Sequence, residues 1–209
     1  MPSTGLSPSK LHRRWQTADS EERRRLIVAA AIDLLSQRRR NGVTMRRVAH
    51  RLGIGTMTLY TYIESQAVLY REMTCRGFEL LDEICHRHST LGAQAKWRGG
   101  ARAYLQFAMD NPNLYSLMFD VPIATGPDGR EDEQILRGGC QSLVDKVLAE
   151  MAQQGLRGPQ LQARAYEAAG RFWFALHGLA SLLIAGRTSI FNRDVDELLD
   201  DLIEHVAPT

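Results

Sequence analysis

The sequence of 209 residues predicts an all-α fold with about nine helices. Apolar residues recur at spacings of three and four residues through most of the chain, which is the period of one helical face. No segment shows the sustained alternation of apolar and polar residues that is typical of a half-buried strand. The chain is long enough for a small N-terminal helical head and a larger helical body with its own core.

The N-terminal segment carries no helical stripe. Residues 1–18 contain Pro, Ser and Gly together with the basic run KLHRRW at 10–15, and we expect them to form a disordered basic arm. A first helix is expected to begin near Asp19, because the acidic residues that follow interact favourably with the positive end of a helix dipole. Its buried stripe would run from Leu26 to Leu35, and it would end near the arginine run at 38–40.

Residues 42–69 are predicted to contain two short helices joined by a tight turn. In the first, four apolar residues share one face: Met45, Val48, Ala49 and Leu52. Thr44 stands before them as an N-cap, and Gly53 stands after them as a residue free to take a positive φ. The second helix, at about 55–63, places Leu59 and Ile63 inward and leaves an outward face of Thr56, Met57, Tyr60 and Thr61. Two such helices form a helix-turn-helix, whose second helix can enter a DNA major groove.

The body is predicted to hold the remaining helices. Ser65 can cap the first of them, Pro112 interrupts the pattern, and Pro159 stands at a plausible helix start. Their expected ranges are 65–84, 96–111, 113–119, 135–154, 159–186 and 194–206. We therefore divide the chain into a disordered arm at 1–18, a DNA-binding head at 19–66, and a helical body at 67–209, whose expected roles in effector binding and dimerisation are argued below.

Charge is distributed unevenly between the head and the body. The whole chain has a net charge of only +2, but residues 1–63 carry 12 Lys and Arg against 4 Asp and Glu, a net of +8. Residues 64–209 carry 14 against 20, a net of −6. A basic surface attracts the phosphate backbone by releasing condensed counterions, and an acidic one is repelled by it. Solvated arginine faces are the alternative, but the helix-turn-helix inside the basic third favours double-stranded DNA as the partner.

Several other classes of function find no support. No apolar run is long enough to span a bilayer, and the N-terminus lacks a signal-peptide core, so we expect a cytoplasmic protein without membrane association. Three cysteines at unrelated spacings are expected to be thiols. Cys85 and His88 lie one turn apart but lack the second ligand pair of a structural zinc site, so no metal is expected. No phosphate-binding loop or catalytic triad is recognisable, so no cofactor, catalytic residue or enzymatic activity is expected.

Two motifs carry a resemblance to a known family. VTMRRVAHRLGI at 43–54, followed by GTMTLYTYI at 55–63, resembles the DNA-binding head of the TetR/AcrR transcriptional regulators. NPNLYSLMF at 111–119 and FWFALHGLASLLIAG at 172–186 are similar to the C-terminal domain class named for its Trp-His-Gly signature. The resemblance implies a homodimeric repressor that binds a palindromic operator and releases it when a small molecule enters the body.

The resemblance also implies DNA-contacting positions. They match Thr44, Arg46, Thr56, Met57, Thr58, Tyr60, Thr61, Tyr62 and Gln66. Thr and Tyr hydroxyls can donate to phosphates, Met57 can pack on a thymine methyl, and Arg46 offers a donor fork for guanine. Packing within the head is the alternative for Tyr60 and Tyr62. Gln66 replaces a lysine found in many family members, and the recognition helix carries no Lys or Arg. The basic arm could compensate in a neighbouring minor groove, or remain a solvated tail.

Dimerisation is expected to use the last two helices, at about 160–206. Residues 172–186 are apolar nearly all round, which a helix tolerates when it is buried on several sides. The last helix has leucines on one face and acidic residues on the other. Packed against their symmetry mates, the two helices would form a four-helix bundle about a two-fold axis. The alternative is that both stripes are used within the core of one chain.

The body is also expected to hold a largely apolar effector pocket. Aromatic residues and a methionine cluster in three segments that would line it: Trp97, Tyr104, Phe107, Tyr115, Met118, Phe119, Trp173 and His177. Such pockets are apolar with a few orienting polar groups, here indole, hydroxyl and imidazole groups. A close-packed core is the alternative for each of these residues. A DNA-binding regulator without a small-molecule effector and, from another class, a helical enzyme are the alternative functions.

Overall fold

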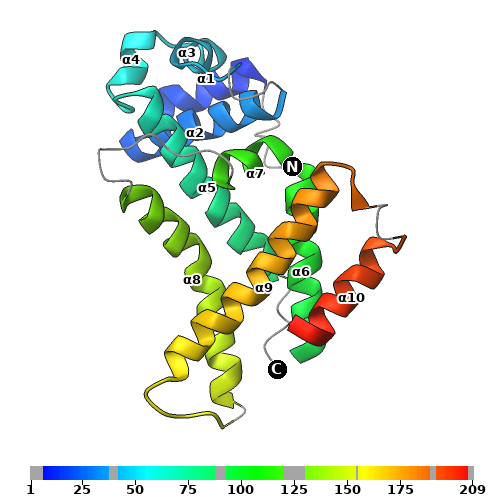
Figure 1. Cartoon of the computed structure of the whole chain (residues 1–209). Helices are drawn as coiled ribbons and strands as arrows, with labels where there is room; N and C mark the ends of the chain where they lie inside the picture. Colours follow the sequence, from blue (N-terminus) through cyan, green and yellow to red (C-terminus); the bar gives the residue numbers. More distant parts are fainter. Residues whose placement is uncertain are drawn as a thin grey trace. The chain divides into compact units, whose positions relative to one another are not determined.

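The chain forms ten helices and no strand within the residues that the structure, a computed structural model, describes: 7–37, 42–87, 93–119, 130–153, 155–188 and 192–206 (Figure 1). The all-α fold is confirmed. The chain divides into two compact units, with residues 1–80 and 111–135 in the first and residues 81–110 and 136–209 in the second. The boundary predicted between 66 and 67 lies inside a helix, and the units divide at 80/81 instead. No helix of the described residues is long and apolar enough to cross a membrane.

The first unit contains the predicted head and two further helices. Its helices are α1 (Pro8–Thr17), α2 (Ser20–Gln37), α3 (Met45–Leu52), α4 (Thr56–Tyr60), α5 (Gln66–Arg87) as far as Leu80, and α7 (Pro112–Phe119). Asp19 begins α2 as predicted, because its carboxylate accepts a hydrogen bond from the Glu22 backbone N–H at 2.8 Å. Ser65 does the same for α5, accepting from Val68 N–H at 3.2 Å.

The disordered arm predicted for residues 1–18 is wrong over most of its length, because residues 8–17 form α1. Pro8 occupies the first turn, where its missing N–H costs no helical hydrogen bond. Leu11 and Trp15 lie one turn apart and are buried, with exposed fractions of 0% and 5%. A helix this short is marginal in isolation, so its packing against α2 and α3 accounts for its stability. Residues 1–6 lie outside the described part of the chain.

Helix α7 packs closely against α2 and α5 within the first unit. The Asn113 side-chain amide donates to the Leu35 carbonyl oxygen at 3.0 Å, near the end of α2. On α5, Gly77 faces Met118: a Cβ at position 77 would lie 2.6 Å from the Met118 sulfur and 2.9 Å from its Cγ. Only glycine therefore permits this approach of the two helices without a rearrangement of Met118, which is itself buried.

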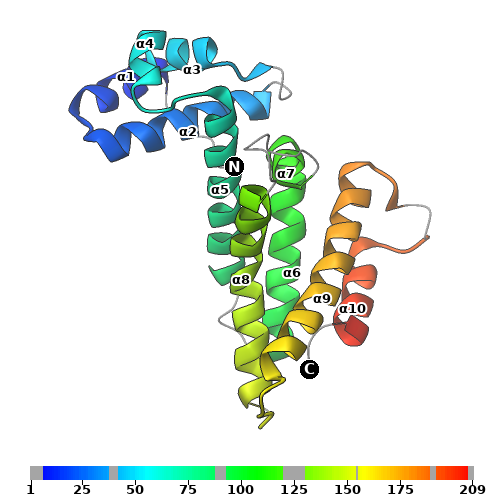
Figure 2. The ribbon, with the colours of Figure 1, turned by 60° about the vertical axis from the view of Figure 1, so that its left-hand side comes forward.

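The second unit consists of α6 (Ala93–Asp110), α8 (Arg130–Gln153) from residue 136 onward, α9 (Leu161–Ile184), α10 (Val195–Val206) and the end of α5. Figure 2 shows these helices side by side, with α6 and α9 between α8 and α10. Val144 and Val147 of α8 pack on a row of small residues of α9, Ala165, Ala168 and Ala169. On α8, Ser142 Oγ donates a hydrogen bond to Asp82 Oδ1, which connects α8 to the end of α5.

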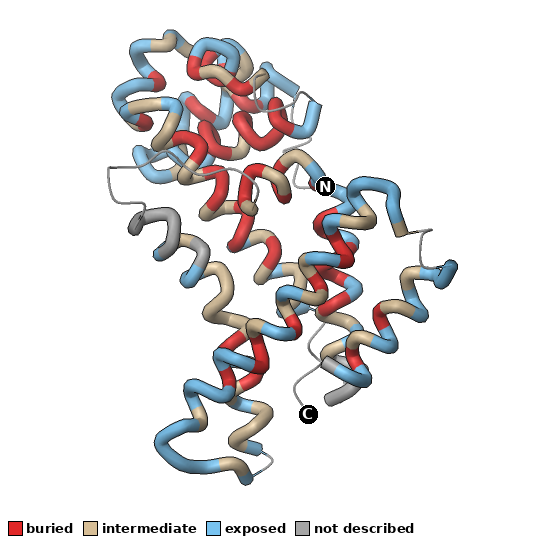
Figure 3. The backbone as a smooth tube through the Cα atoms, in the orientation of Figure 1, coloured by how far each residue is buried: buried red, intermediate tan, exposed pale blue. Residues whose placement is uncertain are grey.

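Helix α10 is attached to α6 and α9 within one chain. Leu199 is fully buried and Ile203 is 6% exposed, so part of the predicted apolar stripe is used in the core of the unit (Figure 3). Two ion pairs join its acidic face to α6: Arg98 with Asp200, at 2.8 Å, and Arg102 with Asp196. The acidic face predicted for this helix is therefore partly paired within the unit.

Candidate DNA-binding surface

Helices α3 and α4 form the predicted helix-turn-helix. Thr44 Oγ1 accepts a hydrogen bond from Arg47 N–H at 3.3 Å and caps α3, as predicted. Gly53 has φ of +69°, a left-handed conformation that L side chains rarely adopt, and the Ile54 N–H donates to the Ala49 carbonyl at 3.0 Å. Helix α4 begins directly afterwards, with Gly55 as its N-cap. The turn therefore fixes the direction of α4 relative to α3.

The outward face of α4 is exposed as predicted. Leu59 and Ile63 are fully buried, whereas Met57 is 79% and Tyr60 43% exposed. Thr58 and Thr61 are exposed and Thr56 is half-buried. An exposed face carrying a thioether, a phenol and hydroxyl groups suits apolar contact with thymine methyls and hydrogen bonding to phosphates. Thr61 already donates its hydroxyl hydrogen to the Thr58 carbonyl at 2.7 Å, so it presents an acceptor outward.

Two predicted DNA contacts, Tyr62 and Gln66, have partners inside the head. The Tyr62 hydroxyl accepts from Arg23 Nη1 at 2.9 Å, and its ring meets the Trp15 ring edge-on at 5.3 Å. The Gln66 amide nitrogen donates to the Val43 carbonyl at 3.0 Å and to the Tyr70 hydroxyl at 2.7 Å. Both amide hydrogens of Gln66 are thus used, and only its carbonyl oxygen, which repels a phosphate, remains. Their DNA contacts stay a prediction: the Tyr62 hydroxyl keeps its hydrogen for donation to a phosphate, whereas Gln66 keeps no donor.

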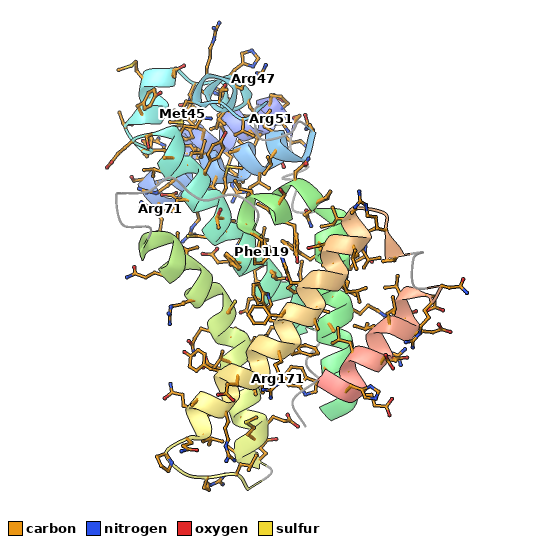
Figure 4. The ribbon with its side chains drawn as sticks, viewed as in Figure 1. Met45, Arg47, Arg51, Arg71, Phe119 and Arg171 are labelled. Carbon is orange, nitrogen blue, oxygen red and sulfur yellow. The ribbon has the colours of Figure 1, made fainter. Side chains whose placement is uncertain are left out.

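The cations of α3 differ in their availability for DNA. Arg46 and Arg47 are exposed, and Arg47 lies at the outer edge of α3, where Nη1 donates to the Gly42 carbonyl (Figure 4). Arg46 makes no ion pair or hydrogen bond with any described residue. Arg51 is not available for DNA in the same way, because Nη2 lies 3.3 Å from the carboxylate of Asp33, which is 1% exposed. This ion pair engages the Arg51 guanidinium with a buried carboxylate inside the head, so Arg51 differs from the exposed Arg46 and Arg47. Residues 38–40 lie outside the described residues.

Sequence reasoning missed the residues that hold α1 on the head. The Arg23 guanidinium lies over the Trp15 ring, 5.5 Å from its centroid, and Arg23 Nε donates to the Trp15 carbonyl at 3.2 Å. His12 Nδ1 lies 3.2 Å from the Leu52 carbonyl oxygen, at the end of α3. The Leu11–Trp15 spacing and Pro8 after a serine were the available signals, but two apolar residues make too short a stripe to distinguish a helix from a tail.

The eight predicted effector residues fall into both units. In the first, the Tyr115 and Phe119 rings lie 4.7 Å apart, and Phe119 meets Phe78 edge-on at 5.3 Å. Met118 is 3% exposed beside them. In the second, Tyr104 and Phe107 of α6 are 5% and 2% exposed.

The half-buried effector residues of the second unit lie on α6 and α9. Trp173 and His177, one turn apart on α9, stack at 5.3 Å with an interplanar angle of 29°. The Trp97 ring meets Phe172 at 5.2 Å.

The cysteines show no sign of an activated thiol or a metal site in the described residues. None of the three forms a disulfide with a described residue, and burial raises the pKa of each. Burial raises the pKa of Cys85 to about 11, against the opposing effect of Lys146. A thiol with such a pKa is a poor nucleophile and metal ligand at neutral pH. The described residues contain no group of three metal-ligating side chains; His88, the predicted neighbour of Cys85, lies outside them.

Comparisons with known proteins agree with this geometry. The family model of the tetracyclin repressor-like C-terminal domain matches residues 97–206, more than half of the chain. A relative named as an uncharacterized HTH-type transcriptional regulator, Rv0681 of Mycobacterium tuberculosis, is 28% identical over 193 residues, covering 88% of this chain and 79% of its own. A Rhodococcus sp. RHA1 protein of unknown function superposes with a TM-score of 0.70 at 20% identity, covering 92% of this chain and 98% of its own.

A solved TetR-family transcriptional regulator from Streptomyces coelicolor has the same fold. It superposes with a TM-score of 0.65 at 19% identity, covering 89% of this chain and 79% of its own. At this identity the likeness concerns the fold alone, and it agrees with the head built around α3 and α4 and with the helical body. With the family model over residues 97–206, these findings identify the chain as a member of the TetR family of transcriptional regulators.

Proposed function

We propose that this regulator binds a two-fold symmetric DNA operator as a homodimer, acts as a repressor in the cytoplasm, and leaves the operator when a small apolar effector binds the body. The observation that carries the DNA-binding part is the recognition face of α4, with Met57 79% and Tyr60 43% exposed over a fully buried inner face. Arg46, which is exposed near the start of α3 and pairs with none of the described residues, adds a cation to the same helix-turn-helix.

The homodimer is supported by a stripe on α9. Phe174 is 68% exposed, and it shares one helical face with Gly178, Ser181 and Ala185, all exposed, at successive spacings of four, three and four. Small residues beside one large apolar residue allow a second helix to approach closely, and an exposed phenylalanine of this kind marks an interaction surface. Leu199, in contrast, is buried within its own unit, so the interface is assigned to α9 and to the half-buried edge of α10 at Leu198 and Leu202.

The DNA-binding part is tested with a duplex selected by the protein from a random-sequence library. The selected site should be palindromic, with half-sites about one helical turn apart or a multiple of it, as two-fold symmetry requires. Arg46→Gln should weaken binding to the selected site by about 1–3 kcal/mol, and weaken binding to random DNA less, if Arg46 reads a base. Arg164→Gln on α9 removes the same charge from the body and should leave both affinities unchanged. Equal losses on both DNAs would make Arg46 a phosphate contact.

The effector part is supported by the Trp173–His177 stack, which offers an aromatic surface with an imidazole that can orient a polar group. A metabolite that binds there should raise the melting temperature of the protein and release the selected DNA, since a ligand stabilises the state it binds. Trp173→Ala should abolish that shift while the protein stays folded, and Met109→Ala, at an exposed site of α6, should not. An unchanged response of Trp173→Ala would place the effector elsewhere, and a lack of any releasing ligand would favour a regulator without an effector.

A further inference from the structure

Helix α1 is held on the turn that precedes the recognition helix. The His12 ring contacts the Leu52 carbonyl, and a Cβ on Gly53 would lie 2.9 Å from His12 Nδ1, so α1 rests directly on the α3–α4 turn. Leu11 and Trp15 fill the space below it, and Arg23 holds Trp15 from the side of α2. Two neighbouring helices therefore fix α1 at a defined place beside the DNA-binding motif, as Figures 1 and 2 both show.

The opposite face of α1 is cationic. Lys10 and Arg13 are exposed, and neither makes an ion pair or side-chain hydrogen bond with a described residue. Arg14 is different, because it pairs with Glu22 of α2. The two free cations lie three residues apart and therefore share one side of the helix, away from Leu11 and Trp15. An ordered helix presents them at fixed positions, which lowers the entropic cost of contacting a ligand.

DNA is the ligand that this charge and this position fit. The recognition helix carries no Lys or Arg, so it supplies no counterion release itself. The N-terminal end of a recognition helix lies in the major groove, and α1 packs on the turn leading into that end. With α4 in the groove, a cation on α1 would therefore lie near the phosphate backbone that borders it.

We propose that α1 is a second DNA-docking element, in which Lys10 and Arg13 bind phosphates of the duplex beside the half-site that α4 enters. This proposal rests on the proposed DNA-binding function. It assigns α1 a role in affinity, through contacts that do not depend on sequence, and leaves base recognition to α3 and α4.

The test measures the salt dependence of binding for the full chain. The probe is a random-sequence DNA duplex about four helical turns long, titrated by fluorescence anisotropy between about 50 and 200 mM salt. The double variant Lys10→Gln/Arg13→Gln should reduce the slope of log K against log salt by about 0.9 for each lost phosphate, or about 1.8 per protomer. Because both side chains are exposed, its melting temperature should equal that of the parent.

The control variant Arg164→Gln/Arg187→Gln removes the same charge from exposed sites of the second unit, and should leave the slope unchanged. If Lys10→Gln/Arg13→Gln keeps the parent slope while the parent chain binds the selected DNA, α1 does not dock on DNA and the proposed function stands. If the parent chain itself binds neither this duplex nor selected DNA, the proposed DNA-binding function is wrong, and the role of α1 is wrong with it. A loss confined to the selected site would indicate base reading by α1 and overturn the phosphate assignment.

Discussion

Phe174→Asp is expected to convert the homodimer into monomers and to lower the affinity for the selected operator by about 10²–10⁴-fold. The side chain is 68% exposed on α9, so aspartate can be accommodated in the monomer, but it would bring two like charges together across a two-fold axis. A monomer engages one half-site at a time and loses the effective concentration that links the second half-site to the first. Sedimentation measures the oligomeric state, and anisotropy measures the affinity.

Two further variants separate dimerisation from folding. Met109→Asp introduces the same charge at a 47% exposed methionine of α6, and the dimer should persist. Leu199→Asp should instead unfold the second unit, because a charge would replace a fully buried side chain. Dimers of Phe174→Asp at the parent's affinity would show that this face of α9 does not form the interface.

Trp15→Ala should destabilise the first unit by about 3–5 kcal/mol, the usual cost of removing a buried tryptophan. The side chain is 5% exposed, and its loss also removes the edge contact with Tyr62 and the cation–π contact with Arg23. Domains are commonly stable by only about 5–15 kcal/mol, so the effect should be plain in urea unfolding of the full chain.

Arg14→Gln is the matched control for Trp15→Ala. It changes the neighbouring residue of α1 and breaks an exposed ion pair with Glu22, for which we expect a loss below about 1 kcal/mol. If Trp15→Ala unfolds at the same urea concentration as the parent, α1 contributes nothing to the stability of the head. A reduced slope of log K against log salt in Lys10→Gln/Arg13→Gln could then not be attributed to an ordered α1.

The parts of the head predicted from the sequence are those that depend on local signals. Thr44 and Gly53 are a cap and a left-handed residue whose chemistry is visible without any neighbour, and they delimit α3 as predicted. The inward placement of Leu59 and Ile63 follows from helical spacing and was equally accessible. Helix α1 escaped prediction because contacts with α2 and α3, rather than its own composition, make it a helix.

The site residues show that local sequence signals do not predict which polar side chains already have partners in the fold. Tyr62 and Gln66 have the chemistry of DNA contacts, but a sequence does not tell whether a polar group already has a partner, and both have partners from other parts of the head. Arg51 resembles its exposed neighbours Arg46 and Arg47, and only the burial of Asp33, eighteen residues earlier, distinguishes it. Long-range pairing of this kind decides which polar residues remain available for function.

The close approach of α5 and α7 has an evolutionary consequence. A Cβ at Gly77 would lie 2.6 Å from the sulfur of Met118 and 3.5 Å from Leu114 Cδ1, so a side chain at one position requires a smaller one at the other. Among relatives that keep this fold, alanine or serine at the position of Gly77 should therefore accompany a shorter residue at the position of Met118. The two positions, which are forty-one residues apart in the sequence, should therefore covary among relatives.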